Sequence, residues 1–418
     1  MSAYFLPADI LLPDFEKVNG TAWSVVACDQ YTSEPAYWQD VRAKVGEEPS
    51  ALKLILPEAE LAEAEAQIPA IHETMELYTK EMLTRHPNSM IFVERTLSNG
   101  RVRRGLVGVI DLEQYDYNKG SHSLIRATEG TVLERIPPRL AVRRDATLEL
   151  PHVMLLIDDP DKTVIEPIAA RCETLETAYA FPLMQRSGTV VGRFVDSVGI
   201  GRITNALSKL ISPDRIHARY GEGVAPLLFA VGDGNHSLAT AKIAYEEIKA
   251  EHGNSALFHP ARYALVEIVN LHDETLHFEP IYRVLFNVDP DDVLSRLEQY
   301  SFGLNGNVEP QHARFLSAKR RGTIHFGAPV EQLVVGTIQT FIDQYLAEHP
   351  EATVDYIHGS KTVEALAREE RAVGFLFSGM EKDELFKTVI HDGALPRKTF
   401  SMGAAADKRF YLECRKIK

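Results

Sequence analysis

The sequence predicts a mixed α/β fold. Three observations support this class: short apolar runs bounded by turn residues, amphipathic segments with helical spacing, and an Asn-Gly pair between two strand-like runs. The chain has 418 residues, of which 45% are hydrophobic and 25% charged, as in ordinary globular proteins. It is therefore long enough to bury a large core without disulfide or metal support.

The first part of the chain combines strands with a long helix. Apolar residues in segment 61–82 recur at spacings of three and four, which is typical of a helix that faces a core. Asn99-Gly100 separates Met90–Thr96 from Val102–Leu112 and predicts a β-hairpin. The other elements expected here are strands at Ala22–Cys28 and Ala51–Leu56 and a helix over 138–146.

The rest of the chain alternates buried strands and helices. The apolar run Leu227–Val231 passes through Gly232-Asp233-Gly234 into a helix expected from His236 to about Glu251. The other expected elements are strands at His152–Ile157, Tyr263–Asn270 and Ala372–Phe377, helices near Asp291–Gln299 and over Val330–Glu348, and an extended segment at Leu395–Lys418. We expect an N-terminal α/β region at 1–150, a central region at 151–290 and a C-terminal α/β region at 291–418.

Charge and cysteine content bound the class of protein. The formal net charge is −14, whereas a general nucleic-acid binder is expected to carry a basic surface, so we expect no nucleic-acid partner. The three cysteines, Cys28, Cys172 and Cys414, have no CxxC spacing, which predicts free thiols in the cytoplasm. Because the sequence shows neither a signal-peptide pattern nor a run of 18 apolar residues, we expect no membrane association.

Basic residues concentrate in two segments, as an anionic small-molecule partner requires. The first segment, 126–144, holds Arg126, Arg135, Arg139, Arg143 and Arg144. The second segment, 395–418, holds Arg397, Lys398, Lys408, Arg409, Arg415, Lys416 and Lys418. Arg139 and Arg143 lie one helical turn apart and can face one anion, although a solvated helix face is the alternative. Arg397-Lys398-Thr399 offers two cations and a hydroxyl on a short segment that a proline fixes; the alternative is a subunit interface, as in a homo-oligomer, or a contact with an acidic surface.

The most informative stretch is the turn Gly232–Ser237. Gly232 and Gly234 permit backbone angles that are closed to other residues. The helix that follows presents unpaired N–H groups and the positive end of its dipole, which together favour an anion. Around this position stand an acid, an amide, an imidazole and a hydroxyl: Asp233, Asn235, His236 and Ser237.

The same residues also suit a plain strand-to-helix connection, in which Asn235 or Ser237 is the helix N-cap. The turn is not a Walker A loop, because GxxxxGK[ST] is absent. It is not a Rossmann fingerprint either, because Leu238 follows Ser237 where a third glycine is needed nearby. His272 and His277 flank two acids, but their spacing fits neither HExxH nor one helical face, so no metal-ligating residue is assigned.

The stretch Val231–Ala241 (VGDGNHSLATA) resembles the DGHHRxxxA signature of the DUF1015 family of bacterial and archaeal proteins. Four other segments resemble blocks of the same family in the same order: Val25–Tyr31 (VVAPPYDV), Ser123–Asp159 (RHExT…DRL…LSPIFLLYDD), Leu276–Arg283 (ILPTHR) and Leu395–Phe400 (MPxKST(Y/F)F). The resemblance covers nearly the whole chain.

The chain departs from the family pattern in several of these motifs, and Cys28-Asp29-Gln30-Tyr31 stands where the family has PPYD. Ser237 stands where the family has arginine, Asn235 stands at its first motif histidine, and Thr128 stands at the histidine of HExT. Glu129 and Thr131 match the acid and the threonine of that motif. A phosphate contact from the missing arginine would therefore require an arginine elsewhere.

The family's turn is in turn similar to the phosphate-binding turn of the ParB/sulfiredoxin superfamily, which includes nucleotide-hydrolysing partition proteins, sulfiredoxin and a free-serine kinase. The resemblance implies a ParB/sulfiredoxin-like core with additional mixed-sheet elaborations. It also implies nucleotide phosphates bound at a helix start, with ATP or ADP and Mg²⁺ as cofactors.

We therefore expect a phosphotransferase or phosphohydrolase that acts on a small hydroxylated metabolite, with serine or phosphoserine as a candidate. Phosphoryl transfer needs charge neutralisation, positioning and one base. The catalytic candidates are Asp233, His236, Glu129 and Asp29. The cofactor-binding candidates are Gly232, Gly234, Asn235, Ser237, Arg139, Arg143 and Lys398. The alternative is a non-catalytic nucleotide- or metabolite-binding regulatory protein that uses the same turn.

Overall fold

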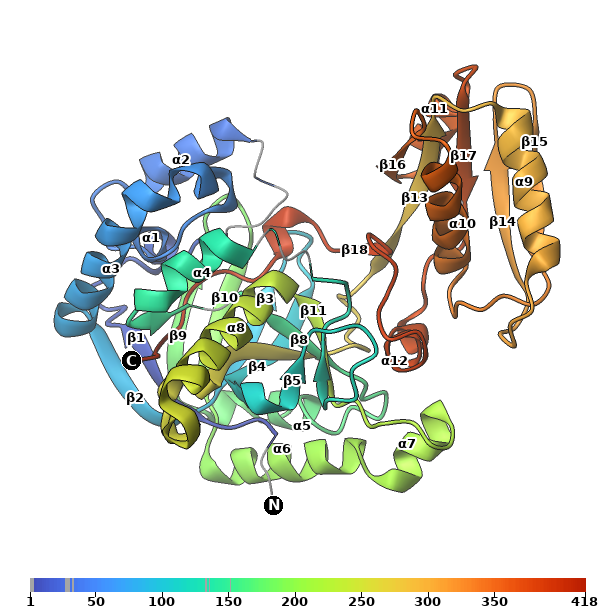
Figure 1. Ribbon diagram of the computed structural model, residues 1–418. Helices are drawn as coiled ribbons and strands as arrows, with labels where there is room; N and C mark the ends of the chain where they lie inside the picture. Colours follow the sequence, from blue (N-terminus) through green and yellow to red (C-terminus); the bar gives the residue numbers. More distant parts are fainter. Residues whose placement is uncertain (1–3, 27–30, 32–33, 132–133, 135, 151) are drawn as a thin grey trace. The chain divides into compact units, whose positions relative to one another are not determined.

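The computed structural model describes residues 4–26, 31, 34–131, 134, 136–150 and 152–418 (Figure 1). The chain divides into two compact units: Met1–Leu276 together with Ala404–Lys418, and His277–Gly403. The limits expected at residues 150 and 290 coincide with neither boundary of this division. Residue 150 falls inside the first unit because strands on both sides of it pair in one sheet.

A mixed central sheet forms the core of the first unit. In spatial order its strands are β5 (Tyr115–Asp116), β6 (Ile125–Arg126), β11 (Phe229–Asp233), β8 (Met154–Ile157), β12 (Tyr263–Asn270), β4 (Val102–Asp111), β3 (Ile91–Thr96), β10 (Thr189–Phe194) and β9 (Thr177–Pro182). β11 pairs parallel with β6 and antiparallel with β8, whereas β12 pairs parallel with β8 and antiparallel with β4. The mixed α/β class predicted from the sequence is confirmed.

Helices cover this sheet in the first unit (Figure 1). They are α1 (Gly20–Trp23), α2 (Pro35–Val45), α3 (Ala64–Glu81), α4 (Ile136–Asp145), α5 (Glu166–Ala169), α6 (Ser197–Leu210), α7 (Pro213–Tyr220) and α8 (Asn235–His252). Alternate strand residues point to opposite faces. Phe92 and Val266 pack with residues of α6 and α8, whereas Ile91 and Leu265 pack with residues of α2 and α3. α4 lies against α8.

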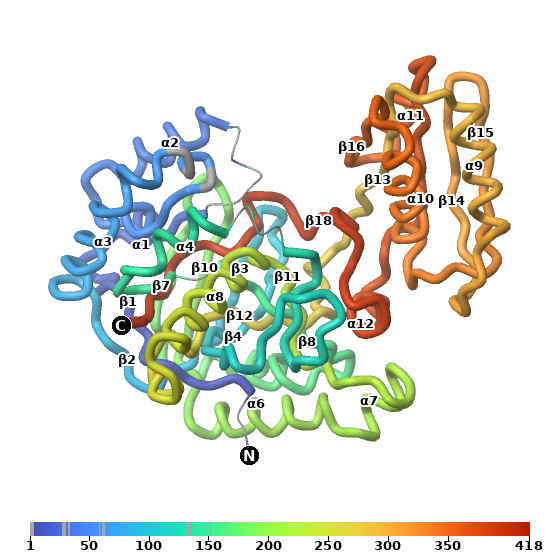
Figure 2. Tube along the Cα trace, viewed as in Figure 1, coloured from blue at the N-terminus to red at the C-terminus, as the bar shows by residue number. Residues whose placement is uncertain are grey.

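The C-terminal segment, drawn in red in Figure 2, supplies one strand of a smaller sheet in the first unit. Its strands are β2 (Leu83–Ser89), β1 (Ala8–Pro13), β19 (Cys414–Lys416) and β7 (Leu148–Glu149). The buried Arg409 forms ion pairs with Glu267 on β12 and with Glu413, and Arg415 pairs with Glu149 on β7. These contacts fix residues 404–418 against the central sheet.

The second unit has its own sheet and helices. Its strands are β15 (Arg321–Phe326), β14 (Gln311–Leu316), β17 (Ala372–Leu376), β13 (Phe278–Phe286) and β16 (Thr353–His358), and β18 (Phe400–Met402) pairs with β13. Its helices are α9 (Pro290–Gly303), α10 (Val334–Glu348), α11 (Ser360–Leu366) and α12 (Lys382–His391). The fully buried Arg283 on β13 donates hydrogen bonds to the carbonyl oxygens of Arg397 and Lys398, which fixes that segment within this unit.

Most of the expected elements are present, and two expectations are wrong. The hairpin predicted around Asn99-Gly100 is formed by β3 and β4. Ala51–Leu54 is a 3₁₀-helix and not a strand, because the Ser50 hydroxyl accepts the Leu52 N–H and turns the chain. The expected strand Ala22–Cys28 begins inside α1, whose first turn Asn19 caps, and its last residues lie outside the described ones.

Two further expectations concern the cysteines and the membrane. Cys172 and Cys414 are free and buried, as predicted, whereas Cys28 lies outside the described residues. Among the helices that the structure describes, none combines the length and the apolar character that a membrane span requires.

Candidate functional site

The turn after β11 is shaped by its two glycines. Gly234 has a φ of +83°, in the left-handed region that side chains disfavour, and α8 begins at the next residue. A Cβ atom on Gly232 would lie 2.8 Å from Leu156 Cγ, and one on Gly234 would lie 3.0 Å from Val153 Cγ2. The turn therefore lies tightly against β8 and the residues just before it, so the start of α8 has a fixed position.

The N-cap residue of α8 is Gly234, which has no side chain and makes no side-chain cap hydrogen bond. Asn235, one of the two residues expected as N-cap, instead binds Thr128 at the end of the β6 segment. The Thr128 N–H donates to Asn235 Oδ1 at 3.2 Å, and Asn235 Nδ2 lies 3.3 Å from Thr128 Oγ1. Thr128 Oγ1 in turn donates to the Val231 carbonyl at 2.6 Å. Neither side chain expected as N-cap therefore stands at the N-cap position, where the positive end of the α8 dipole lies.

Ser237, the other expected N-cap, contacts His152. Ser237 Oγ lies 3.4 Å from His152 Nε2, and the Tyr411 hydroxyl lies 2.6 Å from His152 Nδ1. Burial lowers the pKa of His152, and the positive charges of Arg409, Arg139 and Lys408 lower it further, whereas Asp233 opposes them. At neutral pH the imidazole is therefore uncharged and can exchange a proton with either hydroxyl.

Asp233 closes the turn from the other side. Its Oδ1 accepts the Gly234 N–H at 2.9 Å, and Lys408 Nζ lies 3.0 Å from its Oδ2. Burial acts to raise the pKa of Asp233, but Lys408 and His152 outweigh burial and the pKa is lowered. Asp233 is thus ionised and paired with a cation. The positive charge of Lys408 offsets the repulsion between the carboxylate and an anion nearby.

The arginines expected at the site have different positions. Arg139 on α4 is near enough to His152 to lower its pKa. Arg143 instead pairs with the buried Glu149 at 2.6 Å, a partner that it shares with Arg415, so it is held in a structural ion pair. In the same segment, Arg126 donates to main-chain carbonyls and Arg144 pairs with Glu247, so both have structural roles.

The other predicted site residues divide between the two units. Glu129 follows Thr128 and is half-buried, and His236 is half-buried in the first turn of α8. Lys398 belongs to the second unit, where its ammonium group lies 5.5 Å from the centre of the Tyr356 ring. Asp29 lies outside the described residues.

Sequence reasoning missed three residues of this cluster: His152, Lys408 and Tyr411. Lys408 belongs to the basic C-terminal segment noted in the sequence. Its ion pair with Asp233 could not be predicted, because the two residues are 175 positions apart in the chain. His152 precedes an apolar strand and carries no spacing signal. Only the pairing of β11 with β8, which places Asp233 opposite Met154, brings His152 to the turn.

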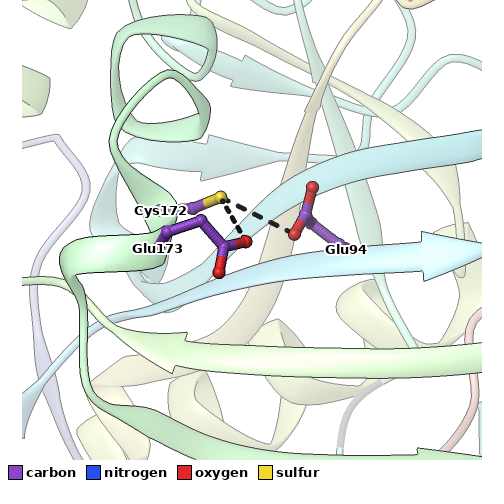
Figure 3. Close-up of side chains that lie close together, drawn as sticks. All are labelled: Glu94, Cys172 and Glu173. Atoms are coloured by element: carbon purple, nitrogen blue, oxygen red, sulfur yellow. Dashed lines mark hydrogen bonds between the residues drawn. The ribbon is translucent and has the colours of Figure 1, made fainter.

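A second polar cluster lies elsewhere in the first unit, where Cys172 faces Glu94 and Glu173 (Figure 3). Cys172 Sγ lies 3.8 Å from an oxygen of each glutamate. Arg193 pairs with both acids, at 2.7 Å and 3.2 Å, and burial raises the pKa of the Cys172 thiol. A protonated thiol is a poor metal ligand, and so are acids that already pair with an arginine. This cluster is therefore an ion-pair network.

A cavity of about 20 Å³ lies beside Arg409, lined among others by Arg95, Arg103 and Glu267. This volume holds about one water molecule. Among the described residues, Arg95 Nε, Arg103 Nε and Glu267 Oε1 find no hydrogen-bond partner, which suits a bridging water and not a metabolite.

The fold and the turn define a mixed α/β protein with a rigid helix start, whose N-cap is a glycine, beside a serine, a histidine and a lysine. The family model described as "Protein of unknown function (DUF1015)" matches residues 12–387. The chain belongs to the DUF1015 family, as its motifs predicted. No curated protein matches the sequence.

Solved structures resemble the chain at low identity. A conserved hypothetical protein from Pyrococcus furiosus is 11% identical, covers 72% of this chain and 92% of its own length, and gives a TM-score of 0.35. A free serine kinase in complex with AMP is 12% identical, with 74% and 91% coverage and a TM-score of 0.36. A C-terminally truncated SbnI from Staphylococcus aureus is 8% identical, with 71% and 83% coverage and a TM-score of 0.32.

Proposed function

We propose that the protein binds the phosphate groups of ATP or ADP at the start of α8 and transfers a phosphoryl group. The acceptor would be a small hydroxylated metabolite in a phosphotransferase, or water in a phosphohydrolase. Serine and phosphoserine are candidate substrates, because the DUF1015 turn is similar to that of the ParB/sulfiredoxin superfamily, which includes a free-serine kinase. That superfamily relationship is part of the proposal.

The observation that carries the proposal is the glycine N-cap of α8, because Gly234 has no capping side chain and allows close approach to the helix start. Asn235 and Ser237, which could have capped it, are engaged by Thr128 and His152 instead. A helix end interacts with a negative charge by about 0.3–1 kcal/mol, and by up to about 2 kcal/mol when partly buried. Hydrogen bonds from the first N–H groups add to this term.

Nearby cations would supply the remaining affinity. Lys408 lies at Asp233 and Arg139 acts on His152, so both charges reach the turn. In a complex with Mg²⁺ and nucleotide, Asp233 would face the metal ion and Lys408 would face phosphate oxygens. In a direct transfer from nucleotide to acceptor, Glu129 would be the base for the acceptor hydroxyl, because Thr128, its neighbour in sequence, is bound to Asn235 at the turn.

One observation favours the non-catalytic alternative. Asp233 is held by Lys408 and has a lowered pKa, so it is a weak base. A protein that binds a nucleotide without turnover would need no stronger one.

Calorimetric titration of ATP and ADP, with and without Mg²⁺, tests binding. A turnover assay with serine and other hydroxy-amino acids tests catalysis. We expect Mg²⁺-dependent binding and phosphorylation of at least one acceptor or release of phosphate. Binding without turnover would select the regulatory alternative, and absence of binding by every phosphorylated ligand would contradict both.

A further inference from the structure

Ser237, His152 and Tyr411 form an array that nucleotide binding alone does not require. His152 Nε2 lies 3.4 Å from Ser237 Oγ, and its Nδ1 lies 2.6 Å from the Tyr411 hydroxyl. Enzymes that use covalent intermediates combine a nucleophile, a base within its reach and a third group that orients the base. The distance between nucleophile and base, here from Ser237 Oγ to His152 Nε2, is often longer without substrate. The Tyr411 N–H donates to the Val25 carbonyl at 2.8 Å, which holds the orienting residue in place.

The surroundings of His152 suit a proton acceptor. With its proton on Nδ1, the imidazole donates to Tyr411 and presents the Nε2 lone pair to the Ser237 hydroxyl. The charged groups that act on it are Asp233 from β11, Arg139 from α4, and Lys408 and Arg409 from the C-terminal segment. Burial, together with the three cations, outweighs Asp233 and lowers the pKa of His152, so the ring is neutral at neutral pH and can accept a proton.

The position of Ser237 suits attack on a phosphate. It is the third residue of α8, so its hydroxyl lies in the same turn as the N–H groups that would hold the anion. Those N–H groups and Lys408 would stabilise the negative charge that spreads over the phosphoryl oxygens during transfer. The serine that replaces the family arginine thus places a nucleophile where the family has a cation.

We propose that Ser237 is a covalent phosphoryl acceptor and that His152 removes its proton. Ser237 Oγ forms a bond to the γ-phosphorus of ATP, the bond from that phosphorus to the β–γ bridging oxygen breaks, and ADP leaves. The hydroxyl proton goes to His152 Nε2 and then to solvent. This inference rests on the proposed function, because it needs ATP at the start of α8.

The second half of the reaction returns the enzyme to its starting state. An acceptor hydroxyl or water attacks the phosphorus of phosphoserine-237 and gives its proton to His152. The bond between phosphorus and Ser237 Oγ breaks, and His152 returns the proton to that oxygen. The kinetics are then of the ping-pong type.

The experiment is rapid mixing of the full-length protein with Mg²⁺ and ATP labelled in the γ-phosphate, followed by denaturation and mapping of the protein-bound label. The variants are Ser237→Ala, Ser237→Thr and His152→Gln. The matched control is Ser197→Ala, because Ser197 is the exposed first residue of α6, where Asp196 caps the helix. We expect label on Ser237 in wild type and in S197A, retention in S237T, none in S237A, and labelling slowed roughly 100-fold in H152Q.

ATP binding is measured by calorimetry in the same samples. ATP bound without label on Ser237, label on another residue, or equal labelling rates in wild type and H152Q overturns the inference and leaves the proposed function intact. Absence of ATP binding overturns both. In wild type the labelling rate should fall only as the pH drops below about 6.5, the ordinary pKa of histidine, because His152 titrates below that value.

Discussion

At the scale of single residues, the charge balance at Asp233 decides what the turn can bind. An isolated carboxylate beside the helix start would repel phosphate, but Lys408 lies 3.0 Å from it. Neither residue is fully buried: 26% of the Asp233 side chain and 15% of the Lys408 side chain are exposed. The pair is therefore accessible to a ligand, and Lys408 can exchange the carboxylate for a phosphate.

Lys408→Met should weaken nucleotide binding. Charge-assisted hydrogen bonds contribute about 1.5–3 kcal/mol, so we expect the Kd for ATP to rise roughly tenfold or more. The pKa of Asp233 should rise in the same variant, because burial is then opposed only by His152 and by the hydrogen bond from the Gly234 N–H. Calorimetry and an NMR titration measure the two effects. Lys416→Met, which changes an exposed lysine of the same segment, is the control. Unchanged affinity in K408M would exclude Lys408 from the site.

Acid should destabilise the protein partly through His152. Its pKa is lowered in the folded state, so below about pH 6.5 the unfolded chain binds a proton that the native state does not. The stability that the neutral ring contributes is present above that pH and is lost as the pH falls toward the folded pKa. Urea unfolding at about pH 7.5 and about pH 5.5 should therefore show a smaller loss of unfolding free energy in His152→Gln than in wild type. His217→Gln, at an exposed position of α7, should behave as wild type. If H152Q loses as much as wild type, His152 does not titrate in this way.

At the scale of elements, the connection from β11 to α8 could be predicted from sequence because its signals are local. An apolar run, two glycines and a helical period identify the strand, the turn and the helix. The partners of the turn could not be predicted, since Thr128, His152 and Lys408 arrive from distant segments. The strand predicted at Ala51–Leu56 is wrong, because a short apolar run fits a strand and a tight turn equally well. Here the Ser50 side chain favours the turn.

Gly234→Ala should affect both stability and binding. A side chain at a φ of +83° costs about 1–2 kcal/mol, and its Cβ would press on Val153 and on any phosphate at the helix start. Gly120→Ala is a matched control, because Gly120 has a φ of +77° and open space around it. Urea unfolding should show a loss in both variants, whereas calorimetry should show weaker ATP binding only in G234A. A folded G234A variant with wild-type affinity would contradict the site.

At the scale of the whole molecule, the chain returns to its first unit after completing the second. Residues 404–418 bring Lys408 and Tyr411 to the turn, and they are held there by the buried pairs of Arg409 and Arg415. The division into consecutive regions at 150 and 290 could not place residues 404–418 in the first unit. Composition describes each stretch of sequence by itself and says nothing about pairing between distant segments. The basic residues of the last segment were visible in sequence, but their acidic partners were not.

Arg409→Met should strongly destabilise the first unit. It leaves Glu267 and Glu413 buried without their shared cation, and breaking a buried pair by removal of one partner costs about 3–5 kcal/mol. Denaturant unfolding measures the change, with Lys416→Met as the surface control. A loss below about 1 kcal/mol would show that these carboxylates find other partners or become protonated.

The central claim is that the start of α8 holds nucleotide phosphate. The most direct measurement is a crystal structure of the full-length protein with Mg²⁺ and ADP. We expect phosphate oxygens within hydrogen-bonding distance of the main-chain N–H groups of residues 235–238, with Lys408 turned from Asp233 toward the phosphate. A nucleotide bound elsewhere, with the first turn of α8 holding only solvent, would contradict the account.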